Sequence, residues 1–78
     1  MPTIEIINGI KICMYNGEHR PPHIHASYNE FEVLMEIESG VIYAGSLPNK
    51  QQKLVSEWLS DNSEWALQVF YELNPQLK

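Results

Sequence analysis

The chain has a single cysteine, few basic residues and no long hydrophobic run, and each shortage excludes a class of protein. Cys13 cannot form an internal disulfide, so a hydrophobic core must hold the fold together in a reducing compartment. No apolar run approaches the length of a membrane-spanning helix. The opening stretch "MPTIEIING" has neither the basic start nor the long apolar centre of a signal peptide. These absences predict a cytoplasmic protein without membrane contact.

Positive charge is scarce as well. Five basic residues stand against ten acidic ones, which gives a net charge of −5. Nucleic-acid binders usually carry a basic surface, so the composition argues against a nucleic-acid partner. With 78 residues, the chain is expected to form one domain over residues 1–78, with a modest core. A domain this small gains stability from a subunit interface, so we expect a homo-oligomer or a protein partner.

The first 45 residues are rich in strand patterns and the remainder in helical ones. Apolar and β-branched residues mark five strand segments: 3–7, 10–15, 23–28, 31–37 and 41–45. A first helix is expected after Pro48, and a second where Asp61 and Glu64 resemble a capping box. Trp58 and Trp65 lie on the apolar stripes of these helices and are predicted to be buried. The predicted fold class is α+β: an antiparallel sheet of four to five strands followed by two C-terminal helices packed on one face.

All three histidines lie within residues 19–25, in the stretch "HRPPHIH". Alternation along a strand places His23 and His25 on one face and apolar residues on the other. A turn at Asn29-Glu30 would set His23 opposite Glu36 and His25 opposite Leu34. The same register brings further polar side chains to this face. The predicted functional face comprises His19, His23, His25, Glu32, Glu36 and Tyr43.

Three interpretations of this face remain open. Two histidines at positions i and i+2 of a strand could bind one divalent metal ion. The third ligand would be the carboxylate of Glu32 or Glu36, or His19 if its loop folds back over the sheet. A histidine beside a carboxylate could instead act in acid–base catalysis. Alternatively, the mixture of aromatic and polar side chains is typical of a protein–protein interface. His23 and His25 are expected to act together, and His19 to contribute less.

Several motifs together resemble one family. The stretches "GIKICMY", "HRPPHIH", "GSLP" and "LVSEW" are similar to those of the short bacterial proteins grouped as the domain of unknown function 4160 family. The resemblance covers nearly the whole chain. It implies a small cytoplasmic α+β protein, often encoded beside a second small protein of the 2442 family in an arrangement like a toxin–antitoxin pair. It implies no established activity, cofactor or catalytic residue.

The sequence therefore predicts a small protein-binding module that works as a component of a toxin–antitoxin-like two-gene system. The alternative is a small metal-dependent or histidine-dependent hydrolase or nuclease that uses the clustered histidines. A divalent metal ion is the one cofactor that the histidine pattern allows.

Overall fold

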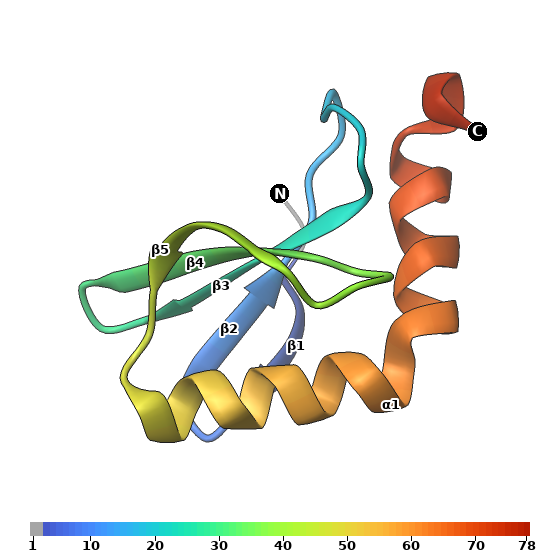
Figure 1. Ribbon diagram of the computed structural model, residues 1–78. Coiled ribbons are helices and arrows are strands. Elements are labelled where there is room, and N and C mark those ends of the chain that lie inside the picture. The colour runs from blue at the N-terminus through green and yellow to red at the C-terminus, as the bar shows by residue number, and fades with distance from the viewer. Residues whose placement is uncertain (1–2) are drawn as a thin grey trace.

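The computed structural model describes residues 3–78, which form a five-stranded sheet and one long C-terminal helix (Figure 1). The strands are β1 (Thr3–Ile7), β2 (Ile10–Cys13), β3 (His23–Tyr28), β4 (Phe31–Glu36) and β5 (Ile42–Ser46). Each strand pairs antiparallel with the next along the chain, in the order β1-β2-β3-β4-β5. The prediction of an antiparallel sheet followed by helical structure is confirmed.

The turns follow from local chemistry. Asn8 and Gly9 both have positive φ (48° and 81°), as the two-residue turn between β1 and β2 requires. Gly45 of β5 has φ +73°, and a Cβ atom built there would lie 2.0 Å from the backbone oxygen of Glu32. Only glycine therefore allows β5 to approach β4 this closely. The register of this pair also shifts between Leu34 and Met35, so the edge of the sheet is irregular.

The predicted pair of C-terminal helices is wrong. A single helix, α1, runs from Asn49 to Leu73, and a 3₁₀ turn follows at Pro75–Leu77. Instead of ending, α1 kinks at Asn62, where φ is −125° and ψ is 17°. The Asn62 side-chain amide donates to the carbonyl of Trp58 at 2.8 Å, one turn earlier. This local bond competes with the helical ladder and bends the helix without an intervening loop.

The kink gives α1 two arms that contact different parts of the molecule. Figure 1 shows the first arm, residues 49–61, running across the sheet, and the second arm, residues 63–73, standing beside the loop that follows β2. No helix among residues 3–78 is both long and apolar enough to cross a lipid bilayer.

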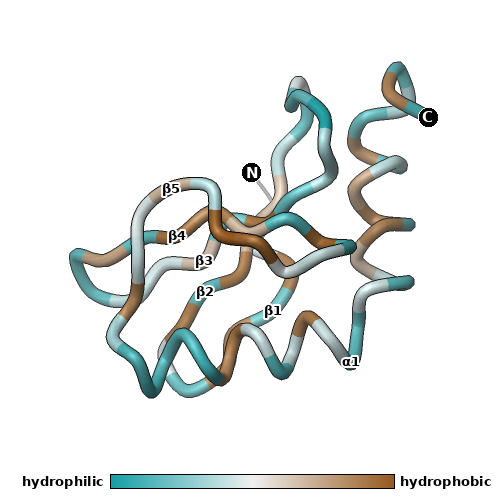
Figure 2. Tube along the Cα trace, in the orientation of Figure 1, coloured by the Kyte–Doolittle hydropathy of each residue, from teal (hydrophilic) through white to brown (hydrophobic). Residues whose placement is uncertain are grey.

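The core lies between the sheet and the two arms. Its strand residues come from the apolar face that alternation predicts, and Figure 2 shows these hydrophobic positions on the central strands and on α1. The fully buried members include Ile12, Ile24, Ala26, Val33, Met35, Val55, Ala66 and Phe70.

The two tryptophans differ in burial. Trp58 is half-buried and packs against the core, whereas Trp65 is 46 % exposed. The kink between them rotates the second arm, so Ala66 and Phe70 face the core instead of Trp65. The two indole rings meet edge to face with their centroids 6.3 Å apart. The prediction that Trp65 is buried is therefore wrong.

Candidate functional site

Strand β3 presents His23 and His25 on the face opposite its apolar residues. Its register with β4 pairs His23 with Glu36 and His25 with Leu34, as the sequence predicts. The flanking residues Ile24 and Ala26 are fully buried against the core. Because β3 is the central strand of the sheet, with its alternate residues anchored, its backbone fixes the spacing of the two imidazoles. Their ring centroids lie 5.2 Å apart.

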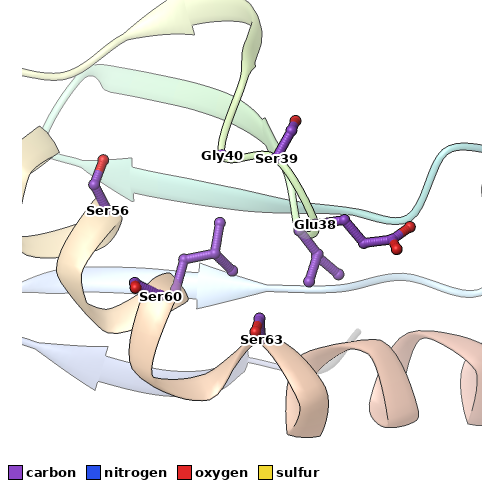
Figure 3. Close-up of a pocket in the computed structure, with 8 residues that line it drawn as sticks. Glu38, Ser39, Gly40, Ser56, Ser60 and Ser63 are labelled. Carbon is purple, nitrogen blue, oxygen red and sulfur yellow. The ribbon is translucent and has the colours of Figure 1, made fainter.

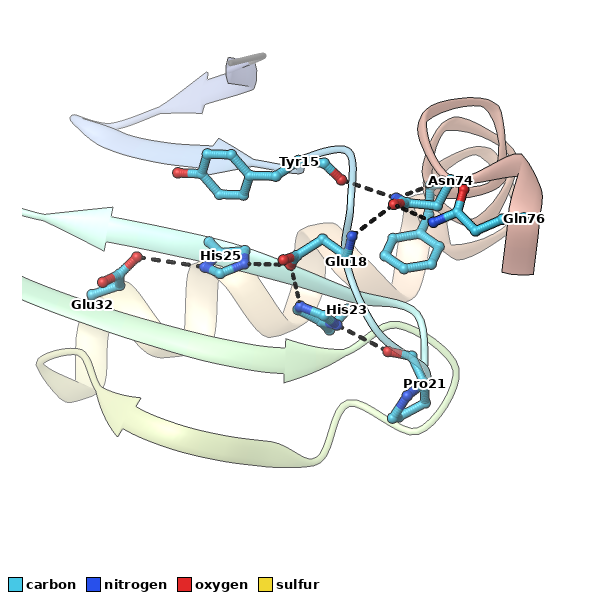
Figure 4. Close-up of polar contacts among 9 residues, drawn as sticks. Tyr15, Glu18, Pro21, His23, His25, Glu32, Asn74 and Gln76 are labelled. Carbon is cyan, nitrogen blue, oxygen red and sulfur yellow. Dashed lines mark hydrogen bonds and ion pairs between the residues drawn. The ribbon is translucent and has the colours of Figure 1, made fainter. Parts of the chain in front are cut away.

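The loop between β2 and β3 folds back and places a carboxylate between these two histidines (Figure 4). Oε2 of Glu18 lies 2.5 Å from Nε2 of His23 and 2.9 Å from Nε2 of His25. The three side chains are 21 %, 11 % and 18 % exposed, respectively, so the group is shielded but still reached by solvent. We call these three residues the Glu18–His23–His25 cluster.

Asn74, at the end of α1, holds this loop in place. It is the one fully buried polar residue among residues 3–78. Its Oδ1 accepts the backbone N–H of Glu18 at 2.8 Å, and its Nδ2 donates to the carbonyl of Tyr15 at 2.9 Å. Arg20, further along the loop, donates from Nε to the carbonyl of Leu77 at 3.1 Å. The C-terminal part of the chain therefore determines where Glu18 lies.

The outer nitrogens of both histidines also have partners. Nδ1 of His23 lies 2.9 Å from the carbonyl of Pro21, which can only accept, so this nitrogen carries a proton. Nδ1 of His25 lies 3.6 Å from Oε2 of Glu32. The ring of Tyr15 packs edge-on against His25, with the centroids 4.7 Å apart. These contacts fix both rings with Nε2 directed at Glu18.

The surroundings change the acidity of two groups in the site. Burial alone would raise the pKa of the Glu18 carboxyl, but the hydrogen bonds and positive charge of His25 and His23 outweigh it and lower that pKa. Burial raises the pKa of the Tyr15 phenol, and contact with Cys13 adds to the rise. Glu18 is therefore ionised at neutral pH and Tyr15 is not.

The structure brings some of the predicted residues together and separates others. Glu32 lies at the edge of the cluster, beside His25. His19 is exposed in the loop, and Glu18, its neighbour, occupies the position between the two strand histidines.

Glu36 and Tyr43 lie outside the cluster. Among the described residues, Glu36 forms no ion pair with a histidine; it accepts a hydrogen bond from the hydroxyl of Ser39. The backbone N–H of Glu36 donates to the carbonyl of Val41 at 2.8 Å, and partial burial and the charge of Glu36 raise the pKa of Tyr43. The face predicted as one site is therefore divided into the cluster and a separate region around Glu36 and Tyr43.

Glu18 is not among the site residues that the sequence predicts. A carboxylate five residues before His23 has no periodic relation to a strand, so spacing alone could not select it. The only signal was its place in a short loop that leads into the histidine strand. The position of Glu18 between the histidines depends on Asn74, which is 56 residues away along the chain.

A hollow away from the cluster lies between the turn after β4 and α1 (Figure 3). Serine hydroxyls from α1 line it, together with the turn residues Glu38 and Ser39. No histidine or basic side chain contributes to its lining. It therefore lacks the paired acid and base, and the charge complementarity to an anion, that would mark a catalytic site.

The chain matches a known protein family over most of its length. Residues 9–70 match the model of the family described as "Domain of unknown function (DUF4160)". The matched range contains the three residues of the cluster and their outer contacts Tyr15, Pro21 and Glu32, but not Asn74. No curated protein and no solved structure matches the chain.

Proposed function

Because this chain belongs to the DUF4160 family, to which no function is assigned, we propose its function from the surface and the site. We propose that it is a small protein-binding module and a component of a toxin–antitoxin-like two-gene system. The gene arrangement that the sequence resemblance implies supplies the candidate partner: the small protein encoded beside it.

The observation that carries this proposal is an apolar patch at the start of β5. Val41, Ile42 and Tyr43 are consecutive, and they are 52 %, 39 % and 50 % exposed. Across residues 3–78, six large hydrophobic side chains are this exposed, and half of them lie in this single stretch. Val41 directly precedes β5, and Ile42 and Tyr43 are its first two residues. Exposed apolar side chains gathered at one place on the edge of a sheet are typical of protein interaction sites. We call these three residues the β5 patch.

The position of the β5 patch supports a protein partner. β5 pairs with β4 on one side only, so the backbone groups of its other edge are free for a partner. Tyr43 combines an aromatic ring with a hydroxyl, a side chain enriched at the centres of interfaces. The patch also lies beside the Glu36 carboxylate, which can add a polar contact at its rim.

Binding of the neighbouring gene product tests the proposal. We expect Ile42→Asp and Tyr43→Ser each to weaken the complex at least tenfold in sedimentation or calorimetric titration, because they place charge or a void in the contact. Ile6→Asp is the matched control, since Ile6 is 58 % exposed on β1, at the opposite edge of the sheet. Equal affinity for all three variants, or no complex with the wild type, would reject the proposal.

A second candidate function is a small hydrolase or nuclease that uses the clustered histidines. The observation that favours it is the Glu18–His23–His25 cluster itself, in which a carboxylate contacts two solvent-reached imidazoles. Such a pair of groups can accept and donate a proton in one reaction. Tag-free protein should then hydrolyse chromogenic phosphodiesters or esters, and His25→Gln should abolish the activity. Equal rates for the two proteins would exclude this function.

A further inference from the structure

We infer that Glu18, His23 and His25 form a binding site for one divalent transition-metal ion of the zinc class. This site goes beyond the protein-binding function and does not depend on it. The two involve different surfaces: the cluster lies over β3, and the β5 patch lies at the edge of the sheet.

Convergence of the ligand atoms is the first argument. Oε2 of Glu18 and one ring nitrogen from each histidine lie within 4.8 Å of one another. In a tetrahedral zinc site, ligand atoms at their usual distance from the ion are about 3.3 Å apart. The oxygen now lies 2.5 Å and 2.9 Å from the two nitrogens, so it must withdraw by less than about 1 Å to reach this spacing. The two ring nitrogens lie within 4.8 Å of each other, and a bound ion would set their final spacing.

The hydrogen-bond roles of His23 are the second argument. Its Nδ1 faces the Pro21 carbonyl and its Nε2 faces the Glu18 carboxylate, so both nitrogens face acceptors. A neutral imidazole has only one N–H and can satisfy only one of them. The position between Nε2 and the carboxylate therefore calls for a cation, either a proton or a metal ion.

The outer contacts are those of a metal site. Histidine ligands usually donate their other ring N–H to a carbonyl or a carboxylate, which fixes the ring and raises its basicity. His23 has the Pro21 carbonyl in that place at 2.9 Å, and the Glu32 carboxylate lies at an ion-pair distance of 3.6 Å from Nδ1 of His25. Glu18 is itself oriented through its backbone N–H by the buried Asn74. His23 and Glu18 are thus held by hydrogen bonds from outside the cluster, and His25 has a charged neighbour on its outer side.

The donor set selects the class of ion. Two imidazole nitrogens and one carboxylate oxygen suit Zn²⁺, Fe²⁺, Co²⁺ or Ni²⁺, whereas Mg²⁺ and Ca²⁺ prefer sites made of oxygen alone. Cys13 is buried and its sulfur contacts Thr3 Oγ1 at 3.6 Å, so it is engaged elsewhere. The cluster supplies three ligands and is partly open to solvent, so an ion bound there would keep one coordination position for water. Catalytic zinc sites have this arrangement, whereas structural zinc sites have four protein ligands.

Metal titration of tag-free, chelator-treated protein tests the site. We expect one equivalent of Zn²⁺ to bind in calorimetry, and Co²⁺ to develop the visible absorption of a nitrogen- and oxygen-ligated site. Glu18→Gln and His25→Gln should each lower the affinity for Zn²⁺ at least tenfold, since each removes a ligand or its charge. His19→Gln is the matched control, because His19 is an exposed histidine next to Glu18 and outside the cluster. It should bind Zn²⁺ like the wild type.

A measurement on the unaltered protein guards against variants that fail to fold. In ¹⁵N NMR spectra of the histidine side chains, Zn²⁺ should shift the Nε2 signals of His23 and His25 and leave His19 unchanged. The absence of stoichiometric Zn²⁺ binding would overturn the inference. So would a shift confined to His19, or an equal loss of affinity in His19→Gln. Unchanged partner binding in the β5 variants would reject the protein-binding function and leave this inference standing.

Discussion

At the scale of single residues, the most informative feature is one carboxylate shared by two imidazoles. Glu18 lies at hydrogen-bonding distance from both His23 and His25, and its backbone is held by a buried amide. Its neighbour His19 is one of the three clustered histidines and was predicted as a site residue, yet it lies exposed to solvent. The chemistry of the site therefore depends on which of two adjacent loop residues faces the sheet.

The lowered pKa of Glu18 predicts a specific pH dependence of stability. The folded state depresses this pKa below its ordinary value of 4.5, so ionised Glu18 stabilises the fold above that value. The contribution is lost as the pH falls through the lower, folded-state pKa. In chelator-treated protein, wild type should exceed Glu18→Gln in free energy of unfolding at pH 5.5, and the difference should shrink toward pH 3.

Urea unfolding at several pH values measures this difference. Glu57→Gln serves as the control, because Glu57 is an exposed glutamate on α1. This variant should follow the wild-type profile throughout. A difference between wild type and Glu18→Gln that stays constant from pH 5.5 to pH 3 would contradict the depressed pKa.

At the scale of elements, the helix and the histidine loop depend on each other. The kink at Asn62 turns the second arm of α1 toward the loop, and Asn74 at the end of that arm bonds the backbone of Tyr15 and Glu18. Without the kink, the first arm would continue past the sheet and Asn74 could not reach the loop. A bend near the middle of α1 is therefore what completes the site.

Removal of the Asn74 amide should destabilise the protein. Asn74→Ala leaves the N–H of Glu18 and the carbonyl of Tyr15 without their partner, and each unsatisfied group costs free energy because both contacts are shielded from water. We expect a loss of about 2–4 kcal/mol in the free energy of unfolding, measured by urea denaturation. Hydrogen exchange at the Glu18 amide should also accelerate.

Gln76→Ala is the control for this variant. Gln76 is exposed, and its amide lies 3.5 Å from Oδ1 of Asn74, which is a weak contact. Its loss should change the stability by less than about 0.5 kcal/mol. Equal stability of the two variants would show that Asn74 does not hold the loop.

At the scale of the whole molecule, one small core joins the sheet, both arms of α1 and the site. Phe70 is fully buried in this core, and its ring also approaches the ring of His23, with centroids 5.8 Å apart. Trp65, on the same arm, is 46 % exposed. Phe70 should therefore contribute more than Trp65 to the stability that the second arm gives the fold.

Truncation of the two aromatic residues should destabilise the protein to very different extents. Phe70→Ala empties a core position and should cost about 3–5 kcal/mol, which is a large part of the stability of a domain this size. Trp65→Ala should cost about 1 kcal/mol or less, because the indole is 46 % exposed and packs edge-on against Trp58 outside the core. Thermal and urea unfolding measure both. A Trp65→Ala protein that loses more stability than Phe70→Ala would contradict the packing of the second arm.

Local patterns determined the sheet almost completely. The alternation in "HIHASY" and "FEVLME", with a two-residue turn between them, is enough to pair His23 with Glu36 and Ala26 with Val33. This is possible because side chains of a strand have a period of exactly two, and only one register buries the apolar face. The pairing of the two histidines on one face was therefore a property of the sequence alone.

Only the tertiary structure decided how the site is completed and how α1 is shaped. A loop has no side-chain period, so no spacing rule could choose Glu18 over His19, and the choice follows from a hydrogen bond to Asn74 across 56 residues. Likewise, Asp61 and Glu64 have the pattern of a helix start, but the side chain of Asn62 bends the existing helix instead. The periodicity of a sequence predicts which face of a strand or helix is buried. Contacts between distant segments depend instead on how those segments pack. The place of Glu18 in the cluster is such a contact, because Asn74 holds its backbone.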